Sequence, residues 1–243
     1  MHQFLSLLRD SSHCVFLSGA GISTLSGIPD FRGSKGLYKQ FDADKIFDID
    51  YFKKNPSYFY THGKDFIYNL DKKEPNIIHK VLAKLEEKGI VKSIITQNID
   101  MLHQKAGSKR VIEIHGSPAS HTCLQCGRRF SYNQIASIVH SQQVVPTCDG
   151  CGGLVKPDII FFGENLNQKS LIQAISESSK ADLMVVIGSS LVVYPAASLP
   201  LNTVKHGGKI IIINNMPTPL DEYAYILYHD LEEVFSYLEK EIK

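Results

Sequence analysis

Four of the five cysteines stand in two pairs whose spacing is typical of a zinc site. The pairs are "CLQC" at 123–126 and "CDGC" at 148–151, and 21 residues separate them. Four thiolates complete the tetrahedral shell of a zinc ion, so the predicted metal, held by Cys123, Cys126, Cys148 and Cys151, is structural and activates no water. Two disulfides or a redox-active pair are the alternatives. Cys14 lies in an apolar run and is expected to be a small buried side chain.

A second candidate site is the bare loop "GAGISTLSGIPDFRG" at 19–33, directly after an apolar run. Glycines let backbone amides approach a ligand closely, most often a phosphate. The dinucleotide fingerprint G-x-G-x-x-G is incomplete, because Thr24 stands at the third glycine position and no acidic strand end follows. A Walker-type loop is excluded, because no Gly-Lys-Ser/Thr follows. The loop therefore predicts a nucleotide site and disfavours hydride transfer.

The end of this loop carries Asp30, Phe31 and Arg32 directly after Pro29. An acid, an aromatic ring and a guanidinium in one exposed turn can cover a bound ligand. The alternative is an ordinary surface turn in which Asp30 and Arg32 contact only each other.

Polar side chains also follow other apolar runs, at the points where parallel strands would end. Gln97, Asn98 and Asp100 follow one run, and His115 follows another. Open α/β sheets bind ligands just beyond the carboxyl ends of their strands. A strand-end histidine, whose ordinary pKa is near 6.5, is a candidate general base, with a structural histidine as the alternative. His103 falls in a helix start and is expected to be structural. Further polar strand ends are Gly188, Ser189, Ser190, Asn214 and Asn215.

Five short apolar runs are expected to be the parallel strands that position these residues. The runs are continuous rather than alternating, as strands covered on both faces should be. Apolar residues at helical spacing lie between them, so we predict a doubly wound, Rossmann-like α/β sheet. The expected strands are 14–18, 93–96, 111–114, 183–187 and 209–214, and the expected helices include 4–8, 77–85 and 231–238.

Two stretches interrupt the alternation of strands and helices. Residues 34–75 are polar and rich in aromatic residues, and they are too long for a simple βα loop. Residues 116–155 carry the paired cysteines. We expect these stretches to form a helical insert and a zinc-ribbon module in one smaller lobe. The expected nucleotide-binding domain then consists of 1–33, 76–115 and 156–243.

The composition is that of an ordinary globular protein, with 243 residues, 43% of them hydrophobic and 21% charged. The formal net charge of +1 provides no global field that would recruit nucleic acid or an anionic membrane, so neither is an expected partner. The first 13 residues do not resemble a signal peptide. Glycine, serine and proline interrupt the most apolar window, 183–201, which favours a strand and loop over a membrane span. A cytoplasmic location is expected.

Together these motifs resemble the sirtuins, a family of NAD-dependent protein lysine deacylases. The resemblance covers essentially the whole chain and rests on "GAGIS…SGIPDFR", "TQNID.LH..AG", "HG", the two C-x2-C pairs, "FFGE" at 161–164 and "GSSL" at 188–191. It implies that NAD is consumed as a substrate and that one structural zinc is held. The implied partners are acetylated lysine-containing proteins, and the implied products are free lysine, 2′-O-acyl-ADP-ribose and nicotinamide, which is also an expected inhibitor. Transfer of ADP-ribose to protein, net hydrolysis of NAD, or a binding module without catalysis are the alternatives.

The resemblance also implies a role for each matching residue. His115 would activate a ribose hydroxyl, and Asn98 would share the catalytic site with it. Phe31 would cover the ribose, with Asp30 and Arg32 ordering that loop. The implied NAD contacts are Gly19, Ala20, Gly21, Ser23 and Thr24 at the phosphates, Gln97 at the ribose, Asn98, Ile99 and Asp100 at nicotinamide, and Gly188, Ser189, Ser190, Asn214, Asn215 and Asp230 toward adenosine. The substrate peptide would lie between Phe162 and Gly163 on one side and Val192 and Val193 on the other, although burial of Phe162 and the valines in the core is an alternative.

The acyl group is expected to be uncharged. Relatives that remove succinyl or malonyl groups carry a Tyr-x-x-Arg pair in the helical insert, whose Arg binds the distal carboxylate. The similar stretch here runs from Tyr60 to Gly63, with glycine at the position of that Arg. Burying a carboxylate without a cation is costly, so acetyl or another uncharged group is favoured, although Lys64 stands next to this position.

Overall fold

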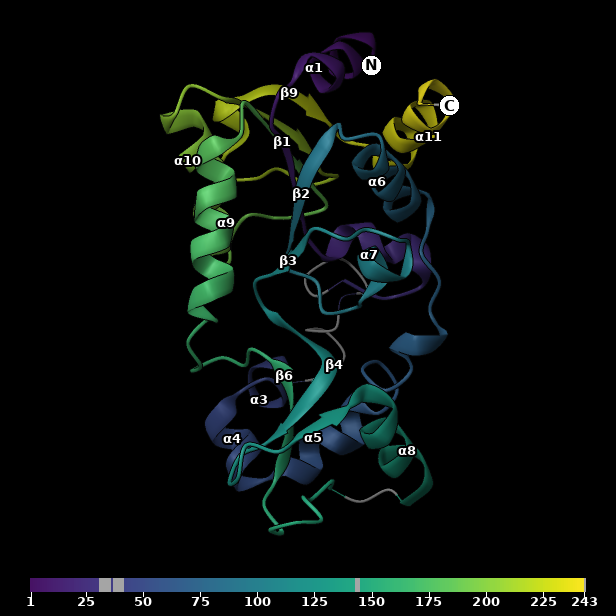
Figure 1. Cartoon of the computed structure of the whole chain (residues 1–243), viewed down its shortest axis with the longest axis vertical. Coiled ribbons are helices and arrows are strands. Elements are labelled where there is room, and N and C mark those ends of the chain that lie inside the picture. The colour runs from purple at the N-terminus through teal and green to yellow at the C-terminus, as the bar shows by residue number, and fades with distance from the viewer. Residues whose placement is uncertain (31–35, 37–41, 143–144, 243) are drawn as a thin grey trace.

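The computed structural model describes residues 1–30, 36, 42–142 and 145–242. Its larger part is a parallel sheet of six strands (Figure 1). Because apolar runs of this length bury both faces, the five expected strands all form. In spatial order the strands are β3 (Val111–Glu113), β2 (Val91–Thr96), β1 (Cys14–Ser18), β7 (Leu183–Ile187), β8 (Lys209–Ile213) and β9 (Ala224–Tyr228).

Helices cover both faces of this sheet, as a doubly wound fold requires. Along β1, Cys14 and Phe16 pack into one apolar core, and Val15 and Leu17 pack into the other. The first core is closed by α1 (His2–Asp10), α6 (Ile77–Glu87) and α11 (Leu231–Glu241), and the second by α9 (Gln168–Lys180) and α10 (Leu199–Lys205). Figure 1 shows α6 and α11 on one side of the sheet and α9 on the other. The three helices expected from the sequence are confirmed.

Shorter helices stand between the longer elements along the chain. Among the described helices, none has the length and apolar composition needed to cross a membrane. The short elements are η1 (Ala20–Ser26), η2 (Leu70–Lys72), α7 (Leu102–Lys105), η3 (Ala196–Ser198) and η4 (Asp221–Tyr223).

The smaller part of the molecule has its own core and lies below the parallel sheet in Figure 1. It contains an antiparallel sheet in the order β5-β4-β6, and four helices of the described residues pack with it. Its elements are β4 (Gly116–Cys123), β5 (Arg129–Ser131), β6 (Val155–Ile159), α3 (Ala43–Ile46), α4 (Ile49–Lys54), α5 (Pro56–Gly63) and α8 (Tyr132–Gln142). The two interrupting stretches thus share one apolar cluster.

β6 crosses the expected boundary of the smaller lobe. We expected the nucleotide-binding domain to resume at residue 156, but β6 pairs with β4 from Val155 to Ile159. The other bounds of the expected domains remain a prediction.

Candidate active site

The carboxyl ends of the parallel strands open into one cavity of about 710 Å³. Residues after β1, β2, β3, β7 and β8 line it on one side, and the loop after β6 lines it from the smaller lobe. Its size is typical of a cofactor or small-ligand site. The structure therefore brings most of the predicted residues together: Gly19, Ala20, Gly21, Asp30, Gln97, Asn98, Ile99, His115, Phe162, Gly163, Gly188, Ser189, Ser190, Val193, Asn214 and Asn215.

The glycines after β1 pack against the loop that follows β7. The amide of Gly19 donates to the carbonyl of Ile187 at 3.0 Å, and that of Gly21 to the carbonyl of Gly188 at 2.9 Å. A Cβ on Gly19 would lie 2.7 Å from the Gly188 oxygen, and one on Gly188 would lie 2.6 Å from the Ile22 nitrogen. Glycine is required here because two backbones touch. We expected the glycine amides to face a phosphate, but they bond within the protein, and the phosphate contacts of this loop remain a prediction.

Asn98 and Asp100 are buried beside this loop, and hydrogen bonds fix both side chains. The amide nitrogen of Asn98 donates to the Gly19 carbonyl at 3.1 Å. Asp100 accepts a hydrogen bond from the Ser23 hydroxyl at 2.6 Å and one from the backbone amide of Leu102 at 2.9 Å. Asp100 therefore forms the wall behind the cavity rather than its lining, and Ser23 acts on that carboxylate.

A second layer of polar side chains supports Asn98 from behind. The hydroxyl of Ser18 donates to that of Thr96 at 2.8 Å, and the Thr96 hydroxyl oxygen accepts from the backbone amide of Asn98 at 3.0 Å. The Nε2 atom of His103 lies 2.9 Å from the Ser18 oxygen, and burial lowers the pKa of His103 to about 3. The expected structural role of His103 is thus this contact. We did not predict the roles of Ser18 and Thr96, although a hydroxyl at the end of each buried run was a usable signal.

His115 lines the cavity at the end of β3. Its Nδ1 atom lies 3.1 Å from the Gln97 carbonyl oxygen, which can only accept, so Nδ1 carries the proton of the neutral ring. Burial lowers the pKa of His115, and the hydrogen bond to Gln97 opposes that shift. At neutral pH the imidazole is therefore uncharged, with an unprotonated Nε2 that can act as a base.

The loop after β6 and the loop after β7 both line the cavity, through Phe162, Gly163 and Val193, whereas the predicted Val192 is not a lining residue. Phe162 and Val192 are 46% and 47% exposed, so the alternative that they belong to the core is wrong. One edge of the first loop is already paired, because the Phe162 amide donates to the Phe47 carbonyl at 2.7 Å and its carbonyl accepts from Ile49 at 3.1 Å. Leu191 has a left-handed φ of 52°, which we did not predict and which turns the second loop at this point.

Several predicted residues do not line the cavity. Ser23 and Asp100 lie behind its wall, and Thr24 donates to the Gly21 carbonyl at 2.9 Å. Asp230 caps the start of α11 by accepting from the Glu233 amide, so its contact with adenosine remains only a prediction. Phe31 and Arg32 lie outside the described residues.

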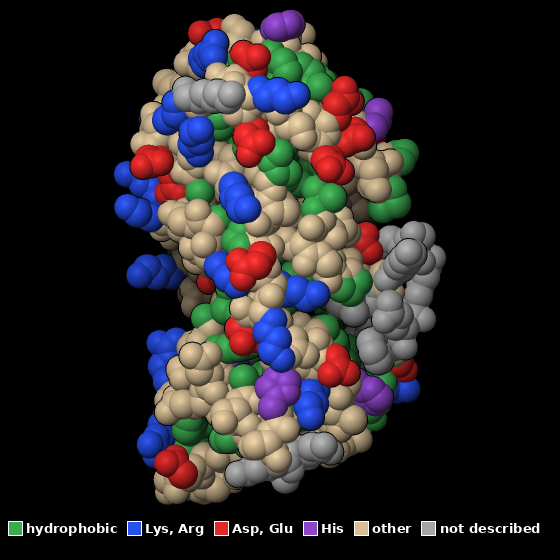
Figure 2. Space-filling view, turned by 90° about the vertical axis from the view of Figure 1, so that its right-hand side faces the viewer, with side chains coloured by type: hydrophobic (Ala, Val, Ile, Leu, Met, Phe, Trp, Pro, Cys, Tyr) green, Lys and Arg blue, Asp and Glu red, His purple; other side chains and the backbone are tan. Residues whose placement is uncertain are grey.

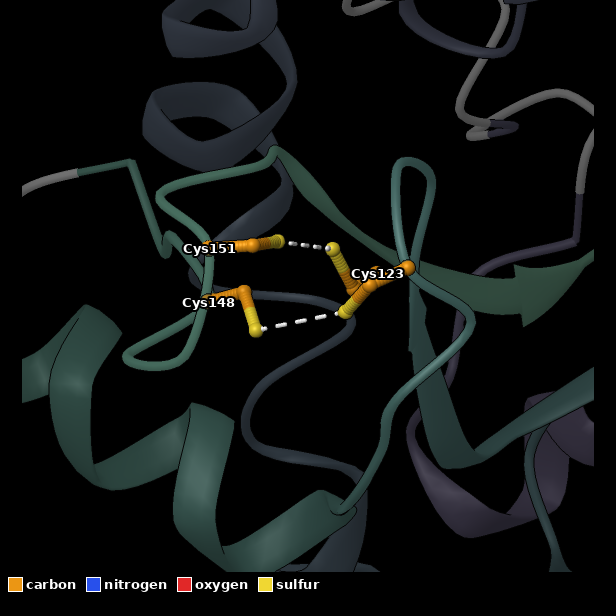
Figure 3. Close-up of side chains that lie close together, drawn as sticks. Cys123, Cys148 and Cys151 are labelled. Carbon is orange, nitrogen blue, oxygen red and sulfur yellow. Dashed lines mark hydrogen bonds between the residues drawn. The ribbon is translucent and has the colours of Figure 1, made fainter.

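The four paired cysteines form one cluster in the smaller lobe. Their sulfur atoms all lie within 4.8 Å of one another, and Figure 3 shows Cys151 pointing toward Cys123. The closest pairs, Cys123–Cys151 and Cys126–Cys148, are 3.5 and 3.7 Å apart. A disulfide requires about 2.05 Å, whereas zinc bonds of about 2.3 Å place tetrahedral sulfurs about 3.8 Å apart. The cluster thus fits a zinc ion.

The two residues used to predict the acyl group lie in the core of the smaller lobe. Tyr60 is buried, and its hydroxyl donates to the Val155 carbonyl at 2.6 Å. Gly63 packs against Phe59 and Ile67. Neither residue lines the cavity, and none of the lining residues that the structure describes is Lys or Arg.

On the face of the molecule that Figure 2 shows, the described side chains form no large region of a single charge sign. In the view of Figure 2, basic and acidic side chains are interspersed over both lobes. This distribution agrees with the formal net charge of +1. Recognition is therefore expected to depend on the cavity and its rim.

Comparisons with known proteins agree with this geometry. A model of the Sir2 family matches residues 19–195. A curated NAD-dependent protein deacetylase of Thermotoga maritima is 51% identical over 229 residues, which are 94% of this chain and 92% of that protein. A solved Sir2 structure with a deacetylated p53 peptide and 3′-O-acetyl-ADP-ribose is 48% identical, with a TM-score of 0.92 and coverage of 99% of this chain and 96% of that chain. A Sir2 structure with a propionylated peptide is 48% identical, with a TM-score of 0.89 and coverage of 99% of this chain and 96% of that chain.

Proposed function

The chain belongs to the Sir2 family, and we propose that it removes acetyl or other uncharged acyl groups from protein lysines with consumption of NAD. The acyl-lysine amide oxygen displaces nicotinamide from the ribose of NAD, a ribose hydroxyl then attacks the acyl carbon, and one water molecule is consumed as the lysine amine leaves and the acyl group stays on ADP-ribose as an ester. The observation that carries this proposal is the unprotonated Nε2 of His115, which lines the same cavity as Asn98 and the loop after β1. A histidine whose free Nε2 can accept a proton in this cavity suits acyl transfer to a sugar hydroxyl.

We assign His115 the role of general base on that hydroxyl. Its Nδ1–H bond to the Gln97 carbonyl holds the ring in the tautomer that leaves Nε2 free. The lowered pKa keeps the base unprotonated at neutral pH. The histidine therefore takes a proton from the ribose hydroxyl as it attacks the acyl carbon.

We assign the nicotinamide end of the site to Asn98, Ile99 and Asp100. Asn98 and Ile99 line the cavity, and Asp100 is held rigidly behind them by Ser23 and Leu102. Asp100 fixes the Ser23 hydroxyl and the start of α7 behind these two residues. Its own hydrogen bond to the carboxamide of nicotinamide requires the ring to reach past the lining formed by Asn98 and Ile99. Holding the ring in one orientation keeps the ribose carbon in line with the attacking amide oxygen, although that oxygen is a weak nucleophile.

We assign the substrate peptide to the space between the loops after β6 and β7. An extended peptide there would add a strand beside Gly163 and Val193, both of which line the cavity. The opposite edge of the first loop is already paired through Phe162, so only the edge toward the cavity is available to a peptide. Backbone pairing gives affinity with modest sequence preference.

The acyl group is proposed to be uncharged, because no described lining residue is a cation that could pair with a distal carboxylate. Tyr60 and Gly63, at which the sequence differs from the Tyr-x-x-Arg pair, lie in the small-lobe core and do not line the cavity. Turnover of one peptide carrying acetyl-lysine or succinyl-lysine checks it. A kcat/KM that favours succinyl-lysine would contradict the assignment.

The decisive experiment incubates an acetylated peptide with NAD and quantifies nicotinamide and acyl-ADP-ribose together. Deacetylation predicts equal amounts of nicotinamide, acyl-ADP-ribose and free-lysine peptide. Nicotinamide without acyl-ADP-ribose would indicate hydrolysis of NAD, and a peptide heavier by ADP-ribose would indicate transfer to protein. Either result would overturn the proposal.

We further propose a reducing compartment such as the cytoplasm. Four of the five cysteines form the cluster that fits zinc, and the closest sulfur pairs in it, at 3.5 and 3.7 Å, are too far apart for disulfides. Thiolate ligands of this kind persist where disulfides are kept reduced.

A further inference from the structure

One lysine of the smaller lobe is buried directly beneath the loop that we assign to the peptide. Lys156 lies in β6 and is 5% exposed. Lysine is almost never buried without partners, because its ammonium loses its hydration. The cysteine cluster, the His115 site and the comparisons do not account for this side chain.

The ammonium of Lys156 has a complete set of partners, and all of them belong to residues 157–164. It donates to the carbonyl oxygens of Pro157 at 3.1 Å and Ile159 at 2.6 Å. It forms an ion pair with the Glu164 carboxylate at 2.8 Å and lies 4.1 Å from the centre of the Phe161 ring. One charge thus contacts the segment before, within and after the turn that carries Phe162 and Gly163.

The carboxylate of Glu164 passes this contact on to the turn itself. The oxygen of Glu164 that contacts Lys156 also accepts from the Phe161 amide at 2.7 Å. The Glu164 amide in turn donates to the Phe161 carbonyl at 3.0 Å. Both backbone groups of Phe161 are therefore tied to Glu164, and the turn is closed by a side chain that Lys156 holds.

The loop is then fixed from two sides. Phe162 is paired with Phe47 and Ile49 along its outer edge, and the Lys156–Glu164 pair supports the turn from below. Gly163, with a left-handed φ of 88°, is left facing the cavity. A peptide adds a strand with higher affinity when the edge of the loop is already ordered, because ordering the loop on binding would cost free energy.

We propose that Lys156 and Glu164 are positioning residues for the peptide, which hold the loop 161–164 in the shape that pairs with an acylated substrate. The inference rests on the proposed peptide site, and it adds that the Lys156–Glu164 pair must hold the loop in place, although we assign neither residue a contact with the peptide. Glu164 lines the cavity, but no hydrogen bond or ion pair in the described residues joins it or Lys156 to the strand-end residues that we assign to NAD. We therefore expect NAD binding to be largely independent of the pair.

The test measures the Kd of a fluorescent acetyl-lysine peptide without NAD, and the KM values of both substrates. K156M and E164A are expected to raise the peptide Kd at least about tenfold, because the turn is no longer held in place. The KM for NAD is expected to stay within about twofold. K156R is expected to bind peptide within about threefold of the unmodified chain, because its guanidinium can donate to Glu164 and Ile159.

The double variant K156M/E164A distinguishes one shared bridge from two separate contacts. If the two residues act as one bridge, the peptide Kd of the double variant is no higher than that of the single variant with the higher Kd. K180M is the matched control, because Lys180 forms an exposed ion pair with Glu177 in α9. Its peptide Kd is expected to stay unchanged.

Three results would overturn the inference. They are a folded K156M that binds peptide within twofold of the unmodified chain, losses that multiply in the double variant, and an equal rise in the KM for NAD. Circular dichroism and bound zinc report folding. If K156M does not fold, E164A provides the same test, because Lys156 keeps its bonds to Pro157 and Ile159. Peptide binding without NAD is measured independently of turnover, so failure of this inference and failure of the proposed function give different results.

Discussion

At the scale of single residues, the chemistry depends on how neutral and charged groups are held in one buried region. His115, Asn98 and Asp100 were predicted from their places after apolar runs, because parallel strands end at one edge of a sheet. The supporting hydroxyls of Ser18 and Thr96 were not predicted, although they bond to each other and to Asn98. Sequence position shows which residues lie at the site, but the partner of a hydroxyl depends on the register of two strands.

Removing the imidazole of His115 tests its role as the base. We expect H115A to lower kcat for deacetylation by about 10²–10⁴-fold, because a positioned base contributes that much. Peptide binding should persist, because the imidazole bonds to the Gln97 carbonyl, and the bond between the His115 carbonyl and the Ile160 amide belongs to the backbone, which the substitution leaves in place. H206A serves as the control, because His206 is an exposed histidine at the end of α10. Turnover of H115A within tenfold of the unmodified chain would remove His115 from the mechanism.

The pH dependence of kcat tests the protonation state of the same ring. Burial lowers the pKa of His115 from its ordinary value near 6.5, so the ring becomes protonated only at lower pH. A base is active when unprotonated, and the acid limb of kcat should therefore fall below pH 6.5. The profile should be flat between that limb and neutral pH. A limb centred above pH 7 would contradict the neutral, buried imidazole.

At the scale of elements, the fold was predictable where burial was complete and not where it was partial. β1 and β7 were predicted with their exact bounds, because both are continuous apolar runs buried on both faces. β9 was missed, since it is an edge strand in which half-buried and exposed side chains alternate. β4 and β6 were missed because their stability comes from pairing with each other and from the cysteine cluster rather than from apolar periodicity.

The close packing of the loops after β1 and β7 gives a prediction for Gly188. A Cβ there would lie 2.6 Å from the Ile22 nitrogen, at a φ of 58°. G188A should therefore separate the two loops and weaken NAD binding at least about tenfold. It should also lower the free energy of unfolding by more than the roughly 1–2 kcal/mol that a left-handed φ costs any alanine. Isothermal titration with NAD and chemical unfolding measure the two effects.

Gly207 supplies a matched control for that substitution. Its φ is 83°, but no atom lies within 4 Å of the position of a Cβ. G207A should thus carry the backbone cost alone, about 1–2 kcal/mol of unfolding free energy, with NAD affinity unchanged. If both variants lose the same stability and neither loses NAD affinity, the contact between the loops does not shape the site.

At the scale of the whole molecule, the site exists only because two lobes with separate cores meet at the strand ends. The parallel sheet supplies His115 and Asn98, and the smaller lobe supplies Phe162 and Gly163. The core of the smaller lobe includes Cys123 and Cys148 themselves. The metal site and the peptide loop are therefore parts of one cooperative unit.

Removal of the metal tests whether this unit depends on the cysteine cluster. Structural zinc contributes roughly 10–16 kcal/mol in small domains, so C126S or a strong chelator should unfold the smaller lobe and abolish deacetylation. The parallel sheet has its own cores and should keep part of the circular dichroism signal. C14A is the control, because Cys14 is buried in the sheet and lies outside the cysteine cluster, and it should retain one zinc per chain by elemental analysis. Full activity of a zinc-free chain would show that packing alone holds the peptide loop, and the two lobes would then be joined by their apolar contacts rather than by the metal.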